Sequence, residues 1–176
     1  SSDVCSSDLS LLFAATLSAQ VAIGKATVSS PAVSLEFYDN ADNTRGIILP
    51  WVTSTVAVTG AVNGTIVYNT ADRKVYVKYA SGWRDLSVDN TGTVTTTLQD
   101  SLTDQDTAKV LIGGDPATDT TPGILVLADT NKAMVLPKVA SPHLNIVNPS
   151  PGMMVYDTTK KQLAVFNGTV WSFWKP

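Results

Sequence analysis

Few residues in this sequence have the chemistry and the spacing that catalysis requires. The chain has one histidine, His143, and one cysteine, Cys5. A Ser-His-Asp arrangement would need His143, but this residue follows Pro142 in a proline-rich segment, and the chain has no G-x-S-x-G nucleophile motif. We interpret His143 as a loop residue and predict no catalytic residue. The sequence therefore indicates a protein that is not an enzyme.

The acidic residues also do not form a known metal motif. Aspartates gather in turn-like segments such as Asp39 to Asp42, where short polar side chains cap turns. The run from Asp39 to Asn43 lacks an oxygen ligand at its third position and the glycine spacing of an EF-hand loop. A loose Ca²⁺ site at Asp39 and Asp42 is the weaker alternative. The sequence predicts no metal site and no cofactor.

Four tryptophans could stack on sugar rings. Trp83 and Trp171 occupy the same position in two similar segments of the chain, so we expect them in a core or an interface. Trp51 and Trp174 do not recur and are the candidates for binding a glycan or another cell-surface ligand. A carbohydrate-binding module is therefore the alternative to a structural protein.

Composition excludes several classes of protein. The net charge of −3 leaves no basic surface for nucleic acid. The hydrophobic fraction of 44% argues against general disorder, and one cysteine excludes a disulfide framework. The chain has no apolar run of about 18 residues, so we expect no transmembrane segment in the mature protein.

The start of the chain indicates processing and export. Residues 1–9 contain Ser-Ser-Asp twice and resemble a translated sequencing adaptor, so we expect them not to belong to the natural protein. Residues 10–20 are uncharged, apolar and end in small residues, which is typical of a truncated signal peptide cleaved after Ala19. A short buried helix is the alternative. We expect a secreted protein, extracellular or at the cell surface.

The rest of the chain is a tandem repeat with blocks about 88 residues apart. Gly64-Thr65-Ile66-Val67-Tyr68-Asn69-Thr70 matches Gly152-Met153-Met154-Val155-Tyr156-Asp157-Thr158, and Gly46 to Pro50 matches Ala133 to Pro137. We divide the chain into repeat 1 at 21–88, a polar linker at 89–109 and repeat 2 at 110–176. Within the linker, residues 93–98 could form a short edge strand.

Each repeat is expected to contain a β-hairpin. Valine and threonine are abundant, whereas Glu36 is the single glutamate, and this composition favours strands over helices. The pattern predicts strands at 64–69 and 74–79 joined by a turn at 70–73. In repeat 2 it predicts strands at 152–157 and 162–166 joined by a turn at 158–161.

Both faces of these hairpins are apolar. Because alternate residues of a strand face opposite sides, Met153 and Val155 point one way while Met154 and Tyr156 point the other. One face is expected to pack within the repeat and the other against a second repeat or subunit; a sandwich that covers both faces within one chain is the alternative. The predicted interface residues are Ile66, Tyr68, Met154, Tyr156, Phe166, Trp83 and Trp171.

The motifs together resemble a repeat of secreted and cell-surface proteins of the Bacteroidota. The resemblance rests on Val21-Ala22-Ile23-Gly24, the Leu-Pro block, the Gly-x-x-Val-Tyr-Asp/Asn-Thr block and the stretch from Phe166 to Trp171. Related modules occur in surface proteins and in tail-fibre-like proteins with trimeric β stalks. The sequence departs from the pattern at Lys25 and Trp51. The resemblance also implies O-glycosylation after aspartate, with Ser101, Thr107, Thr120 and Thr158 as candidates.

These observations predict an all-β fold of two hairpin-containing repeats, completed by oligomerisation as a trimeric fibre or a filament. The expected function is a structural or adhesive segment of an extracellular fibre, filament or adhesin, with self-association as its main partnership. A glycan-binding module and a phage tail-fibre-like protein are the alternatives.

Overall fold

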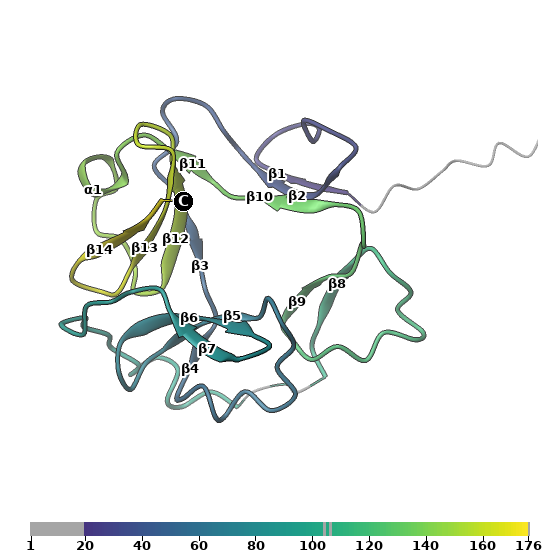
Figure 1. Ribbon diagram of the computed structural model, residues 1–176, viewed down its shortest axis with the longest axis horizontal. Helices are drawn as coiled ribbons and strands as arrows, with labels where there is room; N and C mark the ends of the chain where they lie inside the picture. The colour runs from purple at the N-terminus through teal and green to yellow at the C-terminus, as the bar shows by residue number, and fades with distance from the viewer. Residues whose placement is uncertain (1–19, 104, 106, 176) are drawn as a thin grey trace, which may run out of the picture.

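The computed structural model describes residues 20–103, 105 and 107–175 (Figure 1). The fold is all-β, as the composition predicts, and its one helix in these residues is the four-residue α1 (Pro142–Asn145). No helix among the described residues has the length and apolar character needed to cross a membrane. The adaptor-like segment and the predicted signal peptide up to residue 19 lie outside the described residues.

The two repeats contain the same seven strands in the same order. The strands of repeat 1 are β1 (Val21–Ile23), β2 (Val33–Phe37), β3 (Ile47–Ile48), β4 (Trp51–Val52), β5 (Ile66–Asn69), β6 (Lys74–Tyr79) and β7 (Gly82–Asp85). Their counterparts in repeat 2 are β8 (Val110–Ile112), β9 (Leu125–Leu127), β10 (Ala133–Val135), β11 (Lys138–Val139), β12 (Met153–Asp157), β13 (Gln162–Phe166) and β14 (Trp171–Trp174). The duplication in the sequence is thus a duplication of structure.

Each repeat builds two kinds of sheet. The first two strands of a repeat pair in parallel, β1 with β2 and β8 with β9. The last four form a second sheet, in which a short strand pairs in parallel with a three-stranded antiparallel meander: β4-β5-β6-β7 in repeat 1 and β11-β12-β13-β14 in repeat 2. Figure 1 shows the two meanders next to each other and the β8–β9 pair apart from them.

The predicted hairpins and their turns are confirmed. Strand β5 pairs antiparallel with β6, and β12 pairs antiparallel with β13. The turns fall at residues 70–73 and 158–161. Each ends on a residue with left-handed backbone, Arg73 at φ 63° and Lys161 at φ 54°. Four-residue hairpin connections, most often built around a type I turn, are a common way to close an antiparallel pair.

The third strand of each repeat pairs outside its own repeat. Strand β3 of repeat 1 runs antiparallel to β12 of repeat 2, with Ile48 opposite Met153 and Ile47 opposite Met154. Strand β10 of repeat 2 runs parallel to β2 of repeat 1. The two repeats therefore complete each other's sheets by exchanging strands.

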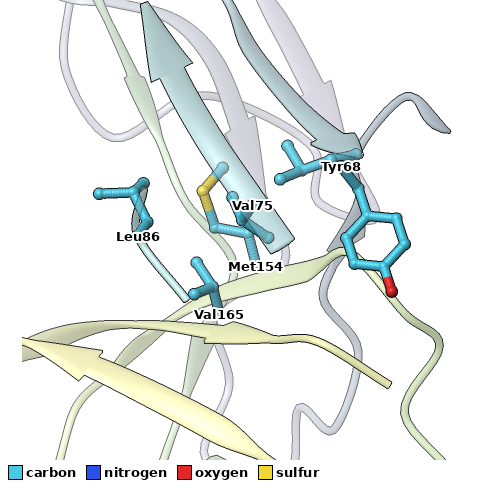
Figure 2. Close-up of a cluster of buried hydrophobic side chains, with 6 residues drawn as sticks. Tyr68, Val75, Leu86, Met154 and Val165 are labelled. Carbon is cyan, nitrogen blue, oxygen red and sulfur yellow. The ribbon is translucent and has the colours of Figure 1, made fainter. Parts of the chain in front are cut away.

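Two apolar cores follow from this exchange. One lies within repeat 2 and consists of Val139, Ile146, Met153, Val155, Ala164 and Phe166. The other is shared by the repeats and consists of Leu49, Tyr68, Val75, Leu86, Met154 and Val165. In Figure 2, Met154 and Val165 of repeat 2 lie against Val75 of repeat 1, with Leu86 and Tyr68 to either side.

The linker prediction needs one correction. Residues 93–98 form no strand. This part of the linker is held by side-chain contacts instead, because the Thr93 hydroxyl donates to the Gly168 carbonyl (3.0 Å) and Val94 packs against the shared core. Its backbone runs beside the turn at Gly168 rather than along the edge of a sheet, so it forms no regular series of strand hydrogen bonds.

Candidate self-association interface

The contact between the repeats is the most developed interaction surface in the described chain. The expected alternation of β12 is present: Met153 and Val155 face the core of repeat 2, whereas Met154 faces the shared core. One face of the hairpin thus packs mainly within its own repeat, with Gly46 of repeat 1 also close to it, and the other face packs against repeat 1. In this structure the second repeat belongs to the same chain, so part of the two-faced hairpin is covered without another subunit.

Tyr68 anchors this contact. Its side chain is 0% exposed, and its hydroxyl donates to the Asn167 carbonyl of repeat 2 (2.7 Å). Burial raises the pKa of Tyr68 to about 12, so the hydroxyl keeps its proton and remains a donor at any physiological pH. Ile66, another predicted interface residue, packs against the same core.

The tyrosine needs a glycine opposite it. A Cβ on Gly152 would lie 2.8 Å from the Tyr68 Cβ, and Gly152 has a left-handed φ of 77°. Both facts exclude a side chain there. The Gly152 carbonyl accepts from the Leu49 amide (3.0 Å), which extends the pairing of β3 with β12 by one residue. Tyr68 and β3 thus converge on the beginning of β12.

The start of the linker makes further hydrogen bonds with repeat 2 beside the shared core. The Asn167 amide donates to the Asp89 carboxylate (3.1 Å), while the Asn167 side-chain oxygen accepts from the amides of Thr169 and Val170. Bonds from Thr91, and then from Asn167, lower the pKa of Asp89. The Trp174 indole donates to the Leu86 carbonyl. Polar groups at the rim of the shared core are therefore paired across the repeats.

The remaining predicted interface residues have different surroundings. Phe166 and Trp171 pack against each other in the core of repeat 2, with ring centroids 5.2 Å apart and ring planes tilted by 44°. Both rings belong to the core of repeat 2 and not to the shared core. Trp83 is half-buried and lines a shallow depression formed by residues 79–85. Tyr156 is partly exposed at 36%.

The two tryptophans predicted to bind glycans are half-buried and take part in internal contacts. Trp51 donates its indole N–H to the Pro151 carbonyl (3.0 Å), and its ring lies 6.1 Å from that of Tyr68. The guanidinium of Arg84 lies over the Trp174 ring at 5.2 Å. Stacking of a sugar on either residue stays a prediction.

The other candidate residues are placed as follows. The predicted glycosylation acceptors Ser101, Thr107, Thr120 and Thr158 are all exposed, and their modification stays a prediction. His143, interpreted from the sequence as a loop residue, lies instead in the short helix α1, and its ring lies edge-on to Phe173 at 5.7 Å. Over residues 20–103, 105 and 107–175, no three His, Cys, Asp or Glu side chains gather in a way that would hold a metal ion.

Asp39, proposed with Asp42 as a loose Ca²⁺ site, is paired with cations. Its carboxylate contacts Lys25 at 3.4 Å and Lys138 at 3.2 Å. Lys138, and then Lys25, lower the pKa of Asp39. Lys25 also contacts the fully buried Glu36 at 3.0 Å. The lysines thus pair with Asp39, whereas Asp42 accepts a hydrogen bond from the Tyr38 hydroxyl (3.4 Å).

The sequence did not reveal the exchange of β3 and β10. One signal was present: Gly46 stands where repeat 2 has Ala133. A Cβ on Gly46 would lie 2.6 Å from Val155 Cγ1 and 2.7 Å from Met153 Cγ. The glycine thus indicates a close approach to the other repeat, but the sequence does not show which residues it approaches.

One family model matches the chain. Residues 115–175, which span most of repeat 2, match the model described as a phage tail like trimerisation region. Comparison with curated proteins and with solved structures gives no match. The match and the all-β fold fit a fibre-like structural subunit that associates with itself. A match of this kind fits a non-enzymatic, structural protein.

Proposed function

We propose that this chain is a structural segment of an extracellular fibre or filament, built by association of identical chains. The observation that carries the proposal is the exchange of β3 and β10. A repeat of this type completes its sheets with strands from a neighbouring repeat. If the neighbour belongs to another chain, the same pairing joins chains into an assembly. The match of residues 115–175 to a trimerisation region supports the same conclusion.

The physical reason for assembly is the incompleteness of a single repeat. A short sheet with apolar residues on both faces is not stable in water by itself. The contact described above covers one face of each meander, and it is made of backbone pairing and buried aromatic anchors rather than of surface charges. Such contacts are typical of permanent interfaces.

Export of the protein is part of the proposal. The apolar stretch before Gln20 supports it, and so does the position of Gln20 itself. The Gln20 amide donates to the carbonyls of Ser30 (3.2 Å), Pro31 (3.1 Å) and Val33 (2.8 Å). Cleavage after Ala19 would leave this anchored residue at the N-terminus. We place the fibre at the surface of a bacterium, in agreement with the resemblance to surface repeats of the Bacteroidota.

The test measures the mass of the purified chain over a range of concentrations. Size-exclusion chromatography with light scattering should give a mass above that of one chain of 18.6 kDa, and negative-stain microscopy should show elongated particles. A compact monomer at high micromolar concentration would contradict the proposal. Sequencing of the N-terminus of the native protein should begin at Gln20, and any other start would remove the export step.

A further inference from the structure

The contact between the two repeats has a direction, and each repeat therefore has two different surfaces. We call the surface that repeat 1 offers to repeat 2 the forward surface: it consists of β2, β3 and Tyr68. We call the surface that repeat 2 offers in return the rear surface: it consists of β10, Gly152 to Met154 and Asn167. Because the repeats are equivalent, repeat 2 also has a forward surface and repeat 1 a rear surface.

The forward surface of repeat 2 is uncovered at its aromatic anchor. Tyr156 is the counterpart of Tyr68, yet it is 36% exposed while Tyr68 is 0% exposed. The two side chains occupy equivalent positions in the equivalent sheets of the two repeats, so their difference comes from the neighbour that Tyr68 has and Tyr156 lacks in this chain.

The same surface lacks a strand. The parallel pair β1–β2 is joined by β10 as a third strand, whereas β8–β9 is a sheet of two strands in the described chain. Leu35 of β2 is 2% exposed beside β10, and its counterpart Leu125 of β9 is 47% exposed. Beside β9 there is thus a place for a strand of the β3 type, and β3 has one edge that no described strand pairs with.

The rear surface of repeat 1 shows the matching gap. Strand β5 pairs with β4 only through Tyr68 and Asn69, and in the described chain no strand pairs with the same edge at Thr65 and Ile66. In repeat 2 that place next to β12 is taken by β3. Gly64, the counterpart of Gly152, would meet nothing within 4 Å if it carried a Cβ.

The residues on the two uncovered surfaces are complementary in size. In the contact within the chain, Gly46 approaches Met153 and Val155. At the equivalent place, the forward surface of repeat 2 has the larger Ala133, and the rear surface of repeat 1 has the smaller, half-buried Thr65 in place of methionine. Val67, the counterpart of Val155, is already covered within the chain. The extra methyl group on one side is matched by a shorter side chain on the other.

We infer that chains join head to tail, with the forward surface of repeat 2 of one chain docked on the rear surface of repeat 1 of the next. In this contact β10 pairs antiparallel with the beginning of β5, so that Val135 lies opposite Thr65 of the next chain. The free edge of β3 pairs with β9. Tyr156 packs on Gly64 of the next chain and donates to the carbonyl of its Tyr79, the counterpart of Asn167. The inference rests on the proposed self-association and names the surfaces that carry it.

The contact is heterologous, because different surfaces meet. A heterologous contact closes into a ring if its rotation allows and otherwise continues as a helical filament. A ring uses every forward and rear surface, and a filament leaves one of each unpaired only at its two ends. Pairing of edges also removes the hazard that open apolar edges present in solution.

Disulfide trapping tests the register. In a Cys5→Ser background, Thr65→Cys with Val135→Cys should give dimers and higher ladders on non-reducing gels after mild oxidation. The matched control is Ile48→Cys with Met153→Cys. Ile48 and Met153 are the counterparts of Val135 and Thr65, and they lie opposite each other within one chain. It should give an oxidised monomer and no ladder, since non-hydrogen-bonded antiparallel pairs have a Cα separation that a disulfide spans.

Mixing separates contacts between chains from contacts within one. A chain with only Thr65→Cys mixed with a chain with only Val135→Cys should give mixed dimers, and neither should crosslink in this way by itself. If light scattering shows oligomers and the control disulfide forms, but the Thr65–Val135 disulfide does not, the inferred register is wrong while self-association stands. A wild-type monomer would overturn both proposals. If the double variant does not fold, Ile48→Cys with Val126→Cys probes the pairing of β3 with β9.

Discussion

At the scale of single residues, polar side chains hold the irregular ends of the strands. Asp157 is the clearest case: it is fully buried, and its Oδ1 accepts from the amides of Ser141 (3.2 Å), Thr159 (2.9 Å) and Lys160 (3.2 Å). Gln162 donates to its other oxygen (3.2 Å). One carboxylate therefore organises both the hairpin turn and the end of β11.

Replacement of Asp157 by alanine should lower the free energy of unfolding by about 3 kcal/mol, because several buried amides lose their acceptor. The matched control is Asn69→Ala in repeat 1. Asn69 occupies the same position, but its side-chain oxygen accepts only the Ala71 amide (3.0 Å) within the described contacts, so we expect a cost of about 1 kcal/mol. Urea denaturation compares the two, and equal costs would contradict this role.

The same residue predicts a dependence on pH. Burial by itself would raise the pKa of Asp157, but the bonds from Lys160, Ser141, Thr159 and Gln162 outweigh it and hold the pKa below the ordinary 3.8. Its contribution to stability is therefore complete above that value and is lost as the pH falls through the lowered pKa. Denaturation curves from pH 6 to pH 2 should show a loss that Asp157→Asn lacks. Parallel curves would contradict the assignment.

At the scale of elements, the exchange of short strands connects the repeats. Strands β3 and β10 have two and three residues, too few for intrinsic propensity to decide their partners. Their place follows from what the neighbouring repeat offers: β3 meets the beginning of β12, and β10 meets β2. The connection depends on the close approach of Gly46 to β12.

Gly46→Ala should therefore destabilise the chain by about 1 to 3 kcal/mol, since the new methyl group overlaps Val155 and Met153. The matched control is Ala133→Ser at the equivalent position of repeat 2, where the residue is exposed in a single chain. This change should cost less than about 0.5 kcal/mol at concentrations where chains are separate. Thermal unfolding monitored by circular dichroism gives both values, and a neutral Gly46→Ala would disprove the close contact.

At the scale of the whole molecule, the two repeats form one cooperative unit. They share a core and exchange strands, so neither completes its sheets alone. The first part of the linker adds contacts to repeat 2 through Asp89 and Thr93 and to the shared core through Val94.

A cut in the linker tests this unity. A protease site inserted between Ser101 and Leu102, which are both exposed, should be cleaved without separating the repeats. The two fragments should elute together on a sizing column and unfold in a single transition. The uncut insertion variant is the control. Elution as two independent species, or two separate transitions, would show that the repeats are autonomous domains.

The sequence by itself determined the local and periodic features. The order of the repeat blocks, the hairpins, the turns at 70–73 and 158–161 and the two-faced pattern of β12 follow from short-range preferences, and these act between residues that are near in the chain. The absence of a catalytic constellation in the sequence also led directly to a structural interpretation.

Only the tertiary structure decided which surfaces meet. Nothing local distinguishes Tyr68 from Tyr156 or Leu35 from Leu125, since each pair occupies equivalent positions with the same residue type. Their different burial comes from contacts with residues that are distant in the sequence. The residues next to each position in the sequence do not indicate these contacts. The strand exchange and its uncovered counterparts therefore became visible only once both repeats were placed in space.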